Sequence, residues 1–559
     1  MLVPLILVAA AASVRAQVAG ISASSEGLNI NFDINVYEST LNNIAASVNA
    51  GPNRTVQDSI PVQKIYGVNR CKGKPAGTAR PAAGLSGRSP RTSAKRRPTP
   101  PSSNVRLLLL VRVRVLTKAT GTPDWESWLT QADVDGIVAA KLNTVRLPLP
   151  FWIIEDIVDR THEPYAQGGL DELIRGLTMF KQAGINVILD HHALPGVAAS
   201  GQMFAGNCTN QVEFYSSAST PLLPDYNYKR AVTWSIVMAF LSHAHPEFAT
   251  VFTIEAVNEP IQDASQTPGL GRFETAFVLG VRAIEFLMGI TCDNTNPLEV
   301  AGALTNNITL PALLEAIPII TKLSIQYDLL SDAAGLNWGA LVGQHGQMSP
   351  GKLGGFLHGR KRKCLSTQFM DQGWQYTGNP ANPAAAAIGP QVYDNHLYFN
   401  FGGVAPAATE LSYMQTLCNI STVATATAAG DTPLYTGEWS LATAFNTTNA
   451  FLQQWGDAQK LAWAGPGSVG WVFWNWKLEE DAQTYPIAGA YLQWDALAAG
   501  LFTADPAEYF DEHVCAVSHL VDTARAPPPL LDPFDTRNLL PLALPVDIKS
   551  TTLFFVIWL

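Results

Sequence analysis

Apolar and polar positions follow two different periods along the chain from Trp125 onward. Longer stretches place apolar residues three or four apart, as an amphipathic helix does, and short runs of nearly continuous apolar residues separate them. The first pattern predicts helices at 125–142, 171–184 and 229–244, with Gly184 at the end of the second. The second pattern predicts buried strands at 143–149, 185–190, 251–257, 391–399, 433–439 and 468–476.

The predicted strands lack the alternation of a sheet that has one face in water. Apolar strands separated by helices indicate a parallel sheet that is covered on both faces. Each strand ends in polar or aromatic residues, and barrel enzymes build their sites at this edge, so we predict an α/β fold, a (β/α)8 TIM barrel. The residues at these strand ends are Arg146, Asp190, His191, His192, Asn258, Glu259, His396, Glu438 and Trp474.

Residues 291–390 interrupt the repeating pattern. They hold about twice the sequence that joins two neighbouring strand and helix units, and they include Trp338 and Trp374. We therefore expect an inserted subdomain or long loops that lie over the site.

Residues 70–118 form an irregular, basic segment rich in Pro and Ser, and no Asp or Glu occurs between Ser59 and Pro123. Such a composition cannot bury a core. Three interpretations of the segment therefore remain: a polybasic arm, a disordered linker, or the product of a mis-assigned reading frame. The barrel is expected to span 61–510 and to begin with Tyr66–Asn69, flanked by an N-terminal extension at 17–60 and a C-terminal extension at 511–559.

Several features indicate export. Residues 1–16 form an apolar run that closes on Val14, Arg15 and Ala16, which is typical of a secretory signal peptide. Six cysteines are widely spread without a Cys-x-x-Cys pair, so disulfides are favoured over a metal site, with their pairing open. We expect a secreted glycoprotein, with cell-wall association as an option. Asn-x-Ser/Thr acceptors occur at Asn53, Asn207, Asn307, Asn419 and Asn446.

Composition excludes some classes of partner. Hydrophobic residues make up 47% and charged residues 15% of the chain, as in an ordinary globular protein. The net charge of −10 argues against nucleic acid. The apolar stretch at 552–559 is shorter than the ~18 residues that span a bilayer. We expect a monomer with no membrane span.

Two glutamates are candidates for glycosidic bond chemistry. Hydrolysis with retention needs two carboxyl groups about 5 Å apart, one protonated and one ionised. Glu259 follows an apolar strand and comes directly after Asn258, and Glu438 ends a short strand before Trp439. A single such glutamate would be read as a surface carboxylate, but two at strand ends with these neighbours favour catalysis.

The order of motifs NTVRLP, ILDHHALPG, NEP, DNHLY, GEW and GWVFWNW resembles glycoside hydrolase family 5 over roughly residues 125–480. DHHALPG and GWVFWNWK look closest to the fungal exo-β-1,3-glucanase branch. The resemblance implies that Glu259 is the catalytic acid/base and Glu438 the nucleophile of a retaining enzyme. It also implies that Arg146, His192, Asn258, His396, Tyr398 and Trp474 line the sugar-binding subsite, and it implies no cofactor and no metal.

Elementary chemistry supports these roles separately. Arg146 can keep the Glu438 carboxylate ionised, or it can form a salt bridge in the barrel interior, for instance to Glu255. His396 and Tyr398 lie two apart on one strand and therefore face the same way, so both can reach Glu438 or a sugar hydroxyl. Trp474 offers a flat apolar face to a pyranose ring, whereas Trp471 and Trp476 are expected to pack.

The adjacent His191 and His192 raise the question of a zinc site beside Asp190. Neighbouring residues of a strand point to opposite faces, so a shared ion is disfavoured and His192 is expected to bind sugar. The chain also departs from the family, because RCKGKPAG follows Tyr66–Asn69 where a first-strand loop is expected.

The resulting hypothesis is a secreted retaining β-glycosidase that hydrolyses β-glucan polysaccharide or oligosaccharide, as an exo-β-1,3-glucanase. A β-1,6-glucanase or a β-mannan hydrolase remains an alternative, because linkage selectivity depends on loops. An inactive carbohydrate-binding barrel is the alternative of another class, and the presence of both glutamates argues against it.

Overall fold

The computed structural model describes the strand and helix array. The predicted signal peptide, the basic segment 70–118 and Tyr66–Asn69 lie outside the described residues. The described residues are 22–24, 27–29, 129–163, 165, 167–200, 211–216, 222–223, 225–288, 290, 292, 295–329, 363–374, 381–476, 493–516 and 554–556. Ser22–Ser24 (β1) and Gly27–Asn29 (β2) pair as a small antiparallel hairpin.

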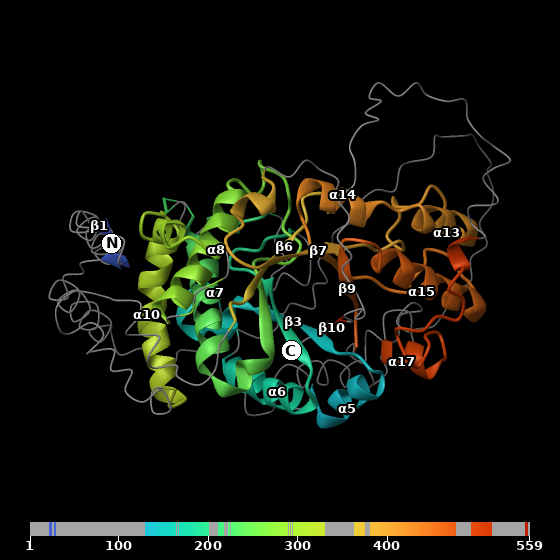
Figure 1. Ribbon diagram of the computed structural model, residues 1–559, viewed down its shortest axis with the longest axis horizontal. Coiled ribbons are helices and arrows are strands. Elements are labelled where there is room, and N and C mark those ends of the chain that lie inside the picture. The colour runs from blue at the N-terminus through green and yellow to red at the C-terminus, as the bar shows by residue number, and fades with distance from the viewer. Residues whose placement is uncertain are drawn as a thin grey trace, which may run out of the picture.

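A closed barrel of parallel strands forms the centre of the molecule, in the order β10-β3-β4-β5-β6-β7-β8-β9 (Figure 1). Every residue of β3 is buried, which explains its run of apolar side chains interrupted only by Thr144 and Arg146. The predicted (β/α)8 fold is thus confirmed. The strands are β3 (Thr144–Pro150), β4 (Asn186–Ala193), β5 (Val251–Glu255), β6 (Ser366–Met370), β7 (Gln391–His396), β8 (Leu434–Glu438), β9 (Ser468–Phe473) and β10 (Phe554–Val556).

Strand β10 occupies the position between β9 and β3. Its Phe554 pairs in parallel with Thr144 of β3 and with Val472 of β9. The strand comes from the segment 511–559, which the sequence pattern placed outside the barrel. The end of the chain therefore supplies the eighth strand of the closed sheet.

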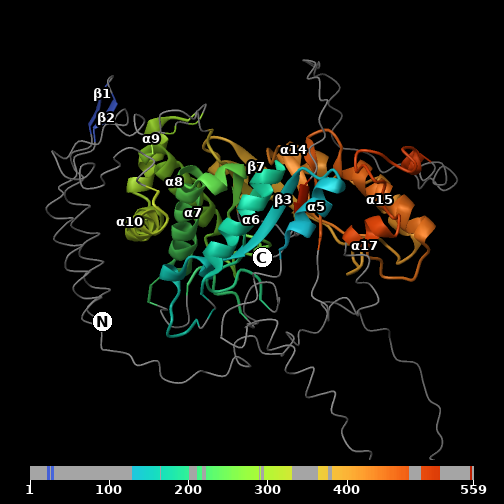
Figure 2. The same ribbon diagram turned by 90° about the horizontal axis from the view of Figure 1, so that it is seen from below.

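Helices cover the barrel on both sides, with α7, α8 and α10 together on one side and α13, α15 and α17 on the other (Figures 1 and 2). Helix α6 ends where Gly184 adopts a left-handed conformation with φ of 72°, as the sequence predicted. The longer helices are α5 (Gln131–Ala139), α6 (Gly169–Ala183), α7 (Tyr226–Ala244), α8 (Leu270–Leu287), α10 (Thr309–Gln326), α13 (Glu410–Cys418), α14 (Thr422–Ala429), α15 (Asn449–Trp463) and α17 (Gln493–Ala498).

Short helical turns complete the wall of the barrel. They are α9 (Pro297–Val300) and the 3-10 turns η3 (Phe151–Ile153), η4 (Glu155–Ile157), η6 (Pro246–Thr250), η7 (Ala301–Leu304) and η8 (Pro383–Ala386). Two of them adjoin a strand, because η3 directly follows β3 and η6 directly precedes β5.

The region 291–390 differs from its sequence interpretation as an insertion. It contributes α10, which packs against α7 and α8, and it also contains the barrel strand β6. The pattern missed β6 because its first half, Ser366-Thr367-Gln368, is polar although Thr367 and Gln368 are fully buried. Pairing with β5 and β7 satisfies the backbone of this strand.

Among the described residues two disulfides hold the outer layer, as the cysteine pattern favoured. Cys292 joins Cys364 just before β6, and Cys418 at the end of α13 joins Cys515. Within the described residues, no helix has the length and apolar character that crossing a bilayer requires.

Candidate active site

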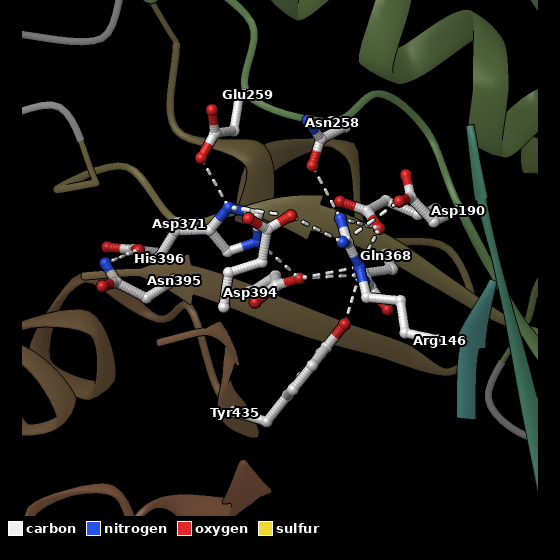
Figure 3. Close-up of polar contacts among 12 residues, drawn as sticks. Arg146, Asp190, Asn258, Glu259, Gln368, Asp371, Asp394, Asn395, His396 and Tyr435 are labelled. Carbon is white, nitrogen blue, oxygen red and sulfur yellow. Dashed lines mark hydrogen bonds and ion pairs between the residues drawn. The ribbon is translucent and has the colours of Figure 1, made fainter. Parts of the chain in front are cut away.

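Arg146, the third residue of β3, lies at the centre of a buried polar cluster inside the barrel (Figure 3). Its Nε donates to Glu255 Oε2 over 2.9 Å, and its Nη1 donates to Glu438 Oε1 over 3.0 Å. Its Nη2 donates to Asn258 Oδ1 over 2.8 Å. One guanidinium therefore contacts the candidate nucleophile and the interior carboxylate together.

The cluster holds more carboxyl groups than cations. Besides Glu255 and Glu438, Asp190 lies 3.1 Å and Asp394 3.5 Å from nitrogens of Arg146. Burial raises the pKa of Glu255 well above its ordinary value, and Arg146 opposes this only in part. Burial also acts to raise the pKa of Asp190, but Arg146 and His192 together hold it below its ordinary value. The interior therefore keeps Asp190 ionised and favours the protonated form of Glu255.

Glu438 ends β8 and is held through both of its carboxylate oxygens. Oε1 accepts from Arg146, and Oε2 accepts from the hydroxyl of Tyr398 over 2.8 Å. The residue is only 5% exposed. Burial raises the pKa of Glu438, while His396 and Arg146 act in the opposite direction. These contacts fix the direction of the carboxylate and partly offset the cost of its burial.

Glu259 lies after β5 in a left-handed backbone conformation with φ of 42°. Side chains other than glycine rarely adopt this region, and such strain gathers at functional sites. Its Oε1 lies 2.7 Å from Nδ1 of His396, and its side chain is 18% exposed. Glu259 is thus the more accessible of the two glutamates.

His396 connects the two candidate carboxylates. Its Nδ1 lies 3.6 Å from Glu438 Oε1, and its Nε2 lies 3.3 Å from Asp394 Oδ2. Burial alone would lower the pKa of His396, but Glu438 and Asp394 raise it well above its ordinary value. These neighbours favour the charged form of the His396 imidazole, which lies between the carboxylates of Glu259 and Asp394.

Glu259, His396 and Glu438 each place one ligand atom within 4.8 Å of the others. This spacing suits the paired carboxyl groups of a retaining glycosidase, and it is also a donor set that a divalent ion could use. A second grouping of Glu285 with Cys292 and Cys364 offers no thiolates, because the two cysteines form a disulfide.

The two adjacent histidines of β4 point apart, as strand alternation predicted. His192 Nδ1 lies 2.6 Å from Asp190 Oδ2, and its ring stacks with Trp474, with ring centroids 5.6 Å apart. His191 instead stacks on Trp234 of α7 at 4.0 Å. His192 and Trp474 therefore belong to the site and His191 to the core. Trp471 and Trp476 are buried, in agreement with a packing role.

Asn258 presents an unused donor. Its Oδ1 is taken by Arg146, whereas Nδ2 is buried without a hydrogen bond partner among the described residues. Buried donors are nearly always paired in folded proteins, so this amide is available to an incoming hydroxyl group.

Several residues of the site were not predicted from the sequence. Asp394 lies two positions before His396 on β7 and therefore faces the same interior, which strand alternation could have indicated. Gln368 donates to Asp394 Oδ2 over 3.1 Å and to the hydroxyl of Tyr435 over 2.6 Å. Phe401, 75% exposed, packs edge-on against Tyr398 at 5.7 Å.

The comparison with protein families decides the family. The family model described as cellulase (glycosyl hydrolase family 5) matches residues 114–480, which is more than half of the chain. The chain belongs to glycoside hydrolase family 5. It is therefore a glycoside hydrolase of a retaining family, acting on glucan, and the resemblance of its motifs is confirmed.

Curated relatives of this family 5 chain are fungal glucanases. A probable glucan endo-1,6-beta-glucosidase B of Neosartorya fischeri is 26% identical over 68% of this chain and 74% of the relative. The glucan endo-1,6-beta-glucosidase B of Emericella nidulans is 25% identical over 70% of this chain and 75% of the relative. A probable glucan 1,3-beta-glucosidase A of Aspergillus niger is 32% identical over 24% of this chain and 29% of the relative.

Solved structures are more distant from this family 5 chain. The rutinosidase from Aspergillus niger shares 14% identity and a TM-score of 0.39, covering 67% of this chain and 83% of that one.

Proposed function

We propose that this family 5 enzyme cleaves β-glucan with Glu438 as nucleophile and Glu259 as general acid/base. The observation that carries the proposal is the convergence of the two carboxylates and His396 within 4.8 Å at the carboxyl end of the barrel. This spacing suits a retaining mechanism, in which the carboxyl groups are about 5 to 5.5 Å apart, whereas inversion needs room for a water molecule between them.

The first step uses the two glutamates in different ionisation states. A carboxylate oxygen of Glu438 attacks the anomeric carbon while the bond from that carbon to the leaving oxygen breaks. Glu259 gives its proton to the leaving oxygen, so the departing sugar leaves as an alcohol. Arg146 and Tyr398 hold Glu438 in place through one oxygen each, so little reorganisation is needed during attack.

The second step reverses these roles. Glu259, now a carboxylate, takes a proton from water while the water oxygen attacks the anomeric carbon and releases Glu438. His396 Nδ1 lies 2.7 Å from Glu259 Oε1 and can hold the side chain in place during this step. Asn258 Nδ2 is free to bind a sugar hydroxyl beside the reacting carbon, and Trp474 with His192 is proposed to receive the pyranose ring.

We propose β-1,6-glucan, cleaved internally, as the first substrate to test. The support is that relatives named glucan endo-1,6-beta-glucosidases align over about two thirds of this chain. The sequence motifs DHHALPG and GWVFWNWK favour exo-β-1,3-glucanase as the second candidate, and the shorter match at 32% identity agrees with it. We further propose that the enzyme is secreted, on the basis of residues 1–16 and the Asn-x-Ser/Thr acceptors.

Polysaccharides with three different linkages distinguish the candidate specificities. Purified enzyme is incubated with pustulan, laminarin and β-mannan, and products are resolved by chain length. A ladder of gluco-oligosaccharides from pustulan supports the first candidate, and glucose alone from laminarin supports the second. The double variant Glu259→Gln/Glu438→Gln is the control for contaminating activity. Hydrolysis of mannan alone, or retention of activity by the double variant, would overturn the proposal.

A further inference from the structure

A cavity of about 250 Å³ lies on the outer layer of the molecule, between α8 and the residues just before α10. The two helices pack side by side (Figures 1 and 2). The proposed hydrolysis uses none of the residues that line this cavity, so it is a separate feature of the surface. The lining residues are Gly271, Arg272, Thr275, Asn306, Asn307 and Ile308.

One residue in the wall of the cavity is a glycosylation acceptor by sequence. Asn307, Ile308 and Thr309 form an Asn-x-Thr triplet. Asn307 is exposed, whereas Thr309 is fully buried and its hydroxyl donates to the carbonyl of Ala276 in α8 over 3.1 Å. The acceptor residue is therefore accessible on the folded surface, while the end of its triplet anchors α10 to α8.

The other acceptors in the described part of the chain lie elsewhere on the surface. Asn419 and Asn446 are both exposed, but neither lines this cavity. Asn419 Nδ2 donates to the carbonyl of Gln415 within α13 over 2.8 Å. Asn446 lies in the loop before α15 and so provides a matched acceptor without the cavity.

The backbone around Asn307 is held in a fixed conformation. Asn306 Oδ1 accepts from the backbone N–H groups of Ile308 and Thr309, each over 2.9 Å. The N–H of Asn306 donates to the carbonyl of Gly302 over 3.0 Å. A sugar attached to this segment is held beside the cavity from the start, so its docking is intramolecular and costs little further entropy.

The size and the lining of the cavity suit one sugar that carries an acetamido group. Pockets for drug-sized ligands measure roughly 300–1,000 Å³, so a smaller cavity fits a single ring. The side chain of Arg272 is 59% exposed. A guanidinium has five N–H donors. Asp225 accepts from Nη1 over 2.7 Å and from Nη2 over 2.9 Å, and the remaining donors can bind the carbonyl oxygen of an acetamido group.

We propose that Asn307 carries an N-linked glycan whose first N-acetylglucosamine lies in this cavity and stabilises the packing of α10 on α8. The inference rests on the export proposed above, because the sugar donor is a lipid-pyrophosphate-linked oligosaccharide of the secretory compartment. Asn307 Nδ2 forms a bond to the anomeric carbon of the first sugar, and the bond from that carbon to the pyrophosphate oxygen breaks. The pyrophosphate leaves with the bonding electrons, and the amide loses one proton. Because Thr309 is buried in the fold, this transfer precedes the packing of α10.

The test compares the glycosylated full chain with trimmed and unglycosylated forms. The protein is produced in a fungal secretory host, and mass spectrometry of its glycopeptides is expected to show a glycan on Asn307. Endoglycosidase H, which leaves only the first N-acetylglucosamine on the chain, should not change the unfolding temperature. Asn307→Gln is expected to lower it by about 2–4 °C. Asn446→Gln, the matched control, should leave it as in the wild type.

A second measurement tests the contact in the cavity. Arg272→Ala should lower the unfolding temperature more in the glycosylated protein than in Asn307→Gln. The loss of the Asp225 pair is common to both backgrounds, so the difference isolates the contact with the sugar. Removal of the whole glycan from the folded wild type by peptide-N-glycosidase should reproduce the loss seen in Asn307→Gln, and it replaces that variant in both comparisons where the variant is not secreted.

Three results would overturn the inference and leave the proposed hydrolysis standing. They are an unmodified Asn307 in the secreted protein, equal unfolding temperatures of the wild type and Asn307→Gln, and a loss on trimming as large as that in Asn307→Gln. Equal effects of Arg272→Ala in both backgrounds would likewise remove the sugar from the cavity. A chain that stays inside the host cells without a glycan would overturn the proposed export and this inference together, whereas the polysaccharide assays test the hydrolysis separately.

Discussion

At the scale of single residues, the site separates two glutamates by their surroundings. Glu438 is nearly enclosed and bound through both oxygens, whereas Glu259 is the more accessible of the two and contacts His396. An enclosed carboxylate in fixed orientation suits attack at carbon, and an accessible one suits proton exchange with a leaving group and with water.

Replacing Glu438 should therefore have a different chemical effect from replacing Glu259. Glu438→Gly is expected to lower hydrolysis at least about a thousandfold, since no nucleophile remains. An α-glucosyl fluoride should still react with a sugar acceptor in this variant, because Glu259 remains as base. Glu259→Ala should still form the covalent intermediate from activated aryl glucosides, and azide should speed its breakdown to a β-glucosyl azide. Product analysis by NMR distinguishes these outcomes, and rescue by azide of Glu438→Gly alone would mean that the roles are reversed.

The charge of His396 should set the acid side of the pH profile. Burial raises the pKa of Glu438, and the His396 imidazolium lowers it, so replacement by Asn removes a lowering contribution. Because Glu438 must be ionised to attack, activity is lost as pH falls through its pKa. His396→Asn is expected to move the acid limb of kcat/KM to higher pH, as well as lowering the maximum. An acid limb that stays in place or moves to lower pH would contradict the assignment, and Phe510→Ala serves as the control.

At the scale of elements, close approach between β7 and β8 brings the groups of the site together. Gly437, directly before Glu438, lies so near Asp394 that a Cβ atom would sit 2.1 Å from its Oδ1. Asp394 contacts both Arg146 and His396. The absence of a side chain at this position thus allows the carboxylate to reach the guanidinium.

Gly437→Ala should therefore displace Asp394 and disturb the site. We expect a loss of about 1–3 kcal/mol in the free energy of unfolding, typical of overpacking, together with a marked fall in kcat. Gly302→Ala in η7 is the matched control, because its added Cβ would meet only Leu279 at an ordinary 3.8 Å. Denaturant unfolding and kinetics on the preferred glucan measure both effects. Wild-type stability and kcat in Gly437→Ala would refute the argument.

At the scale of the whole molecule, the disulfide between Cys292 and Cys364 ties the end of the chain segment after α8 to the start of β6. The bond closes a loop with a sequence separation of 72 residues. It lies beside Glu285, which accepts from the backbone of Leu365 over 2.7 Å and pairs with Arg282 and His243. The bond therefore holds the buried ion network at the amino end of β6 in place.

Loss of this bond should weaken the fold without changing the chemistry. Cys292→Ser/Cys364→Ser is expected to cost about 2–5 kcal/mol of stability, since closing a long loop restricts the unfolded chain. Thermal unfolding of the variant under oxidising conditions measures the effect. The matched control is Cys418→Ser/Cys515→Ser, which removes the other described disulfide and leaves the surroundings of β6 intact. An unfolding temperature equal to that of the wild type would show that packing alone holds β6.

The sequence by itself determined most of the strands and helices and the main residues of the site. Periodicity and the position of a polar residue after an apolar run depend only on neighbouring positions in the chain. Alternation along one strand correctly separated His191 from His192. His396 and Tyr398 both reach Glu438 as expected, although β7 ends at His396 and Tyr398 follows the strand. The sequence grouped Arg146 with Glu438, and the two residues meet across a sequence separation of 292, although Arg146 is the third residue of β3 and does not lie at its end. These inferences needed only the rule that the carboxyl ends of parallel strands meet.

Tertiary structure alone decided what depends on contacts between distant segments. The polar start of β6 becomes a buried strand only through its pairing with β5 and β7, and β10 takes a place in the barrel that no local pattern assigns to the chain end. The same holds for Trp374, which meets His396 because Asn395 clamps its turn. The burial of Glu438 and the charges around it are likewise produced by residues from many elements of the barrel. Neither property can therefore be predicted from the residues adjacent to Glu438 in the sequence.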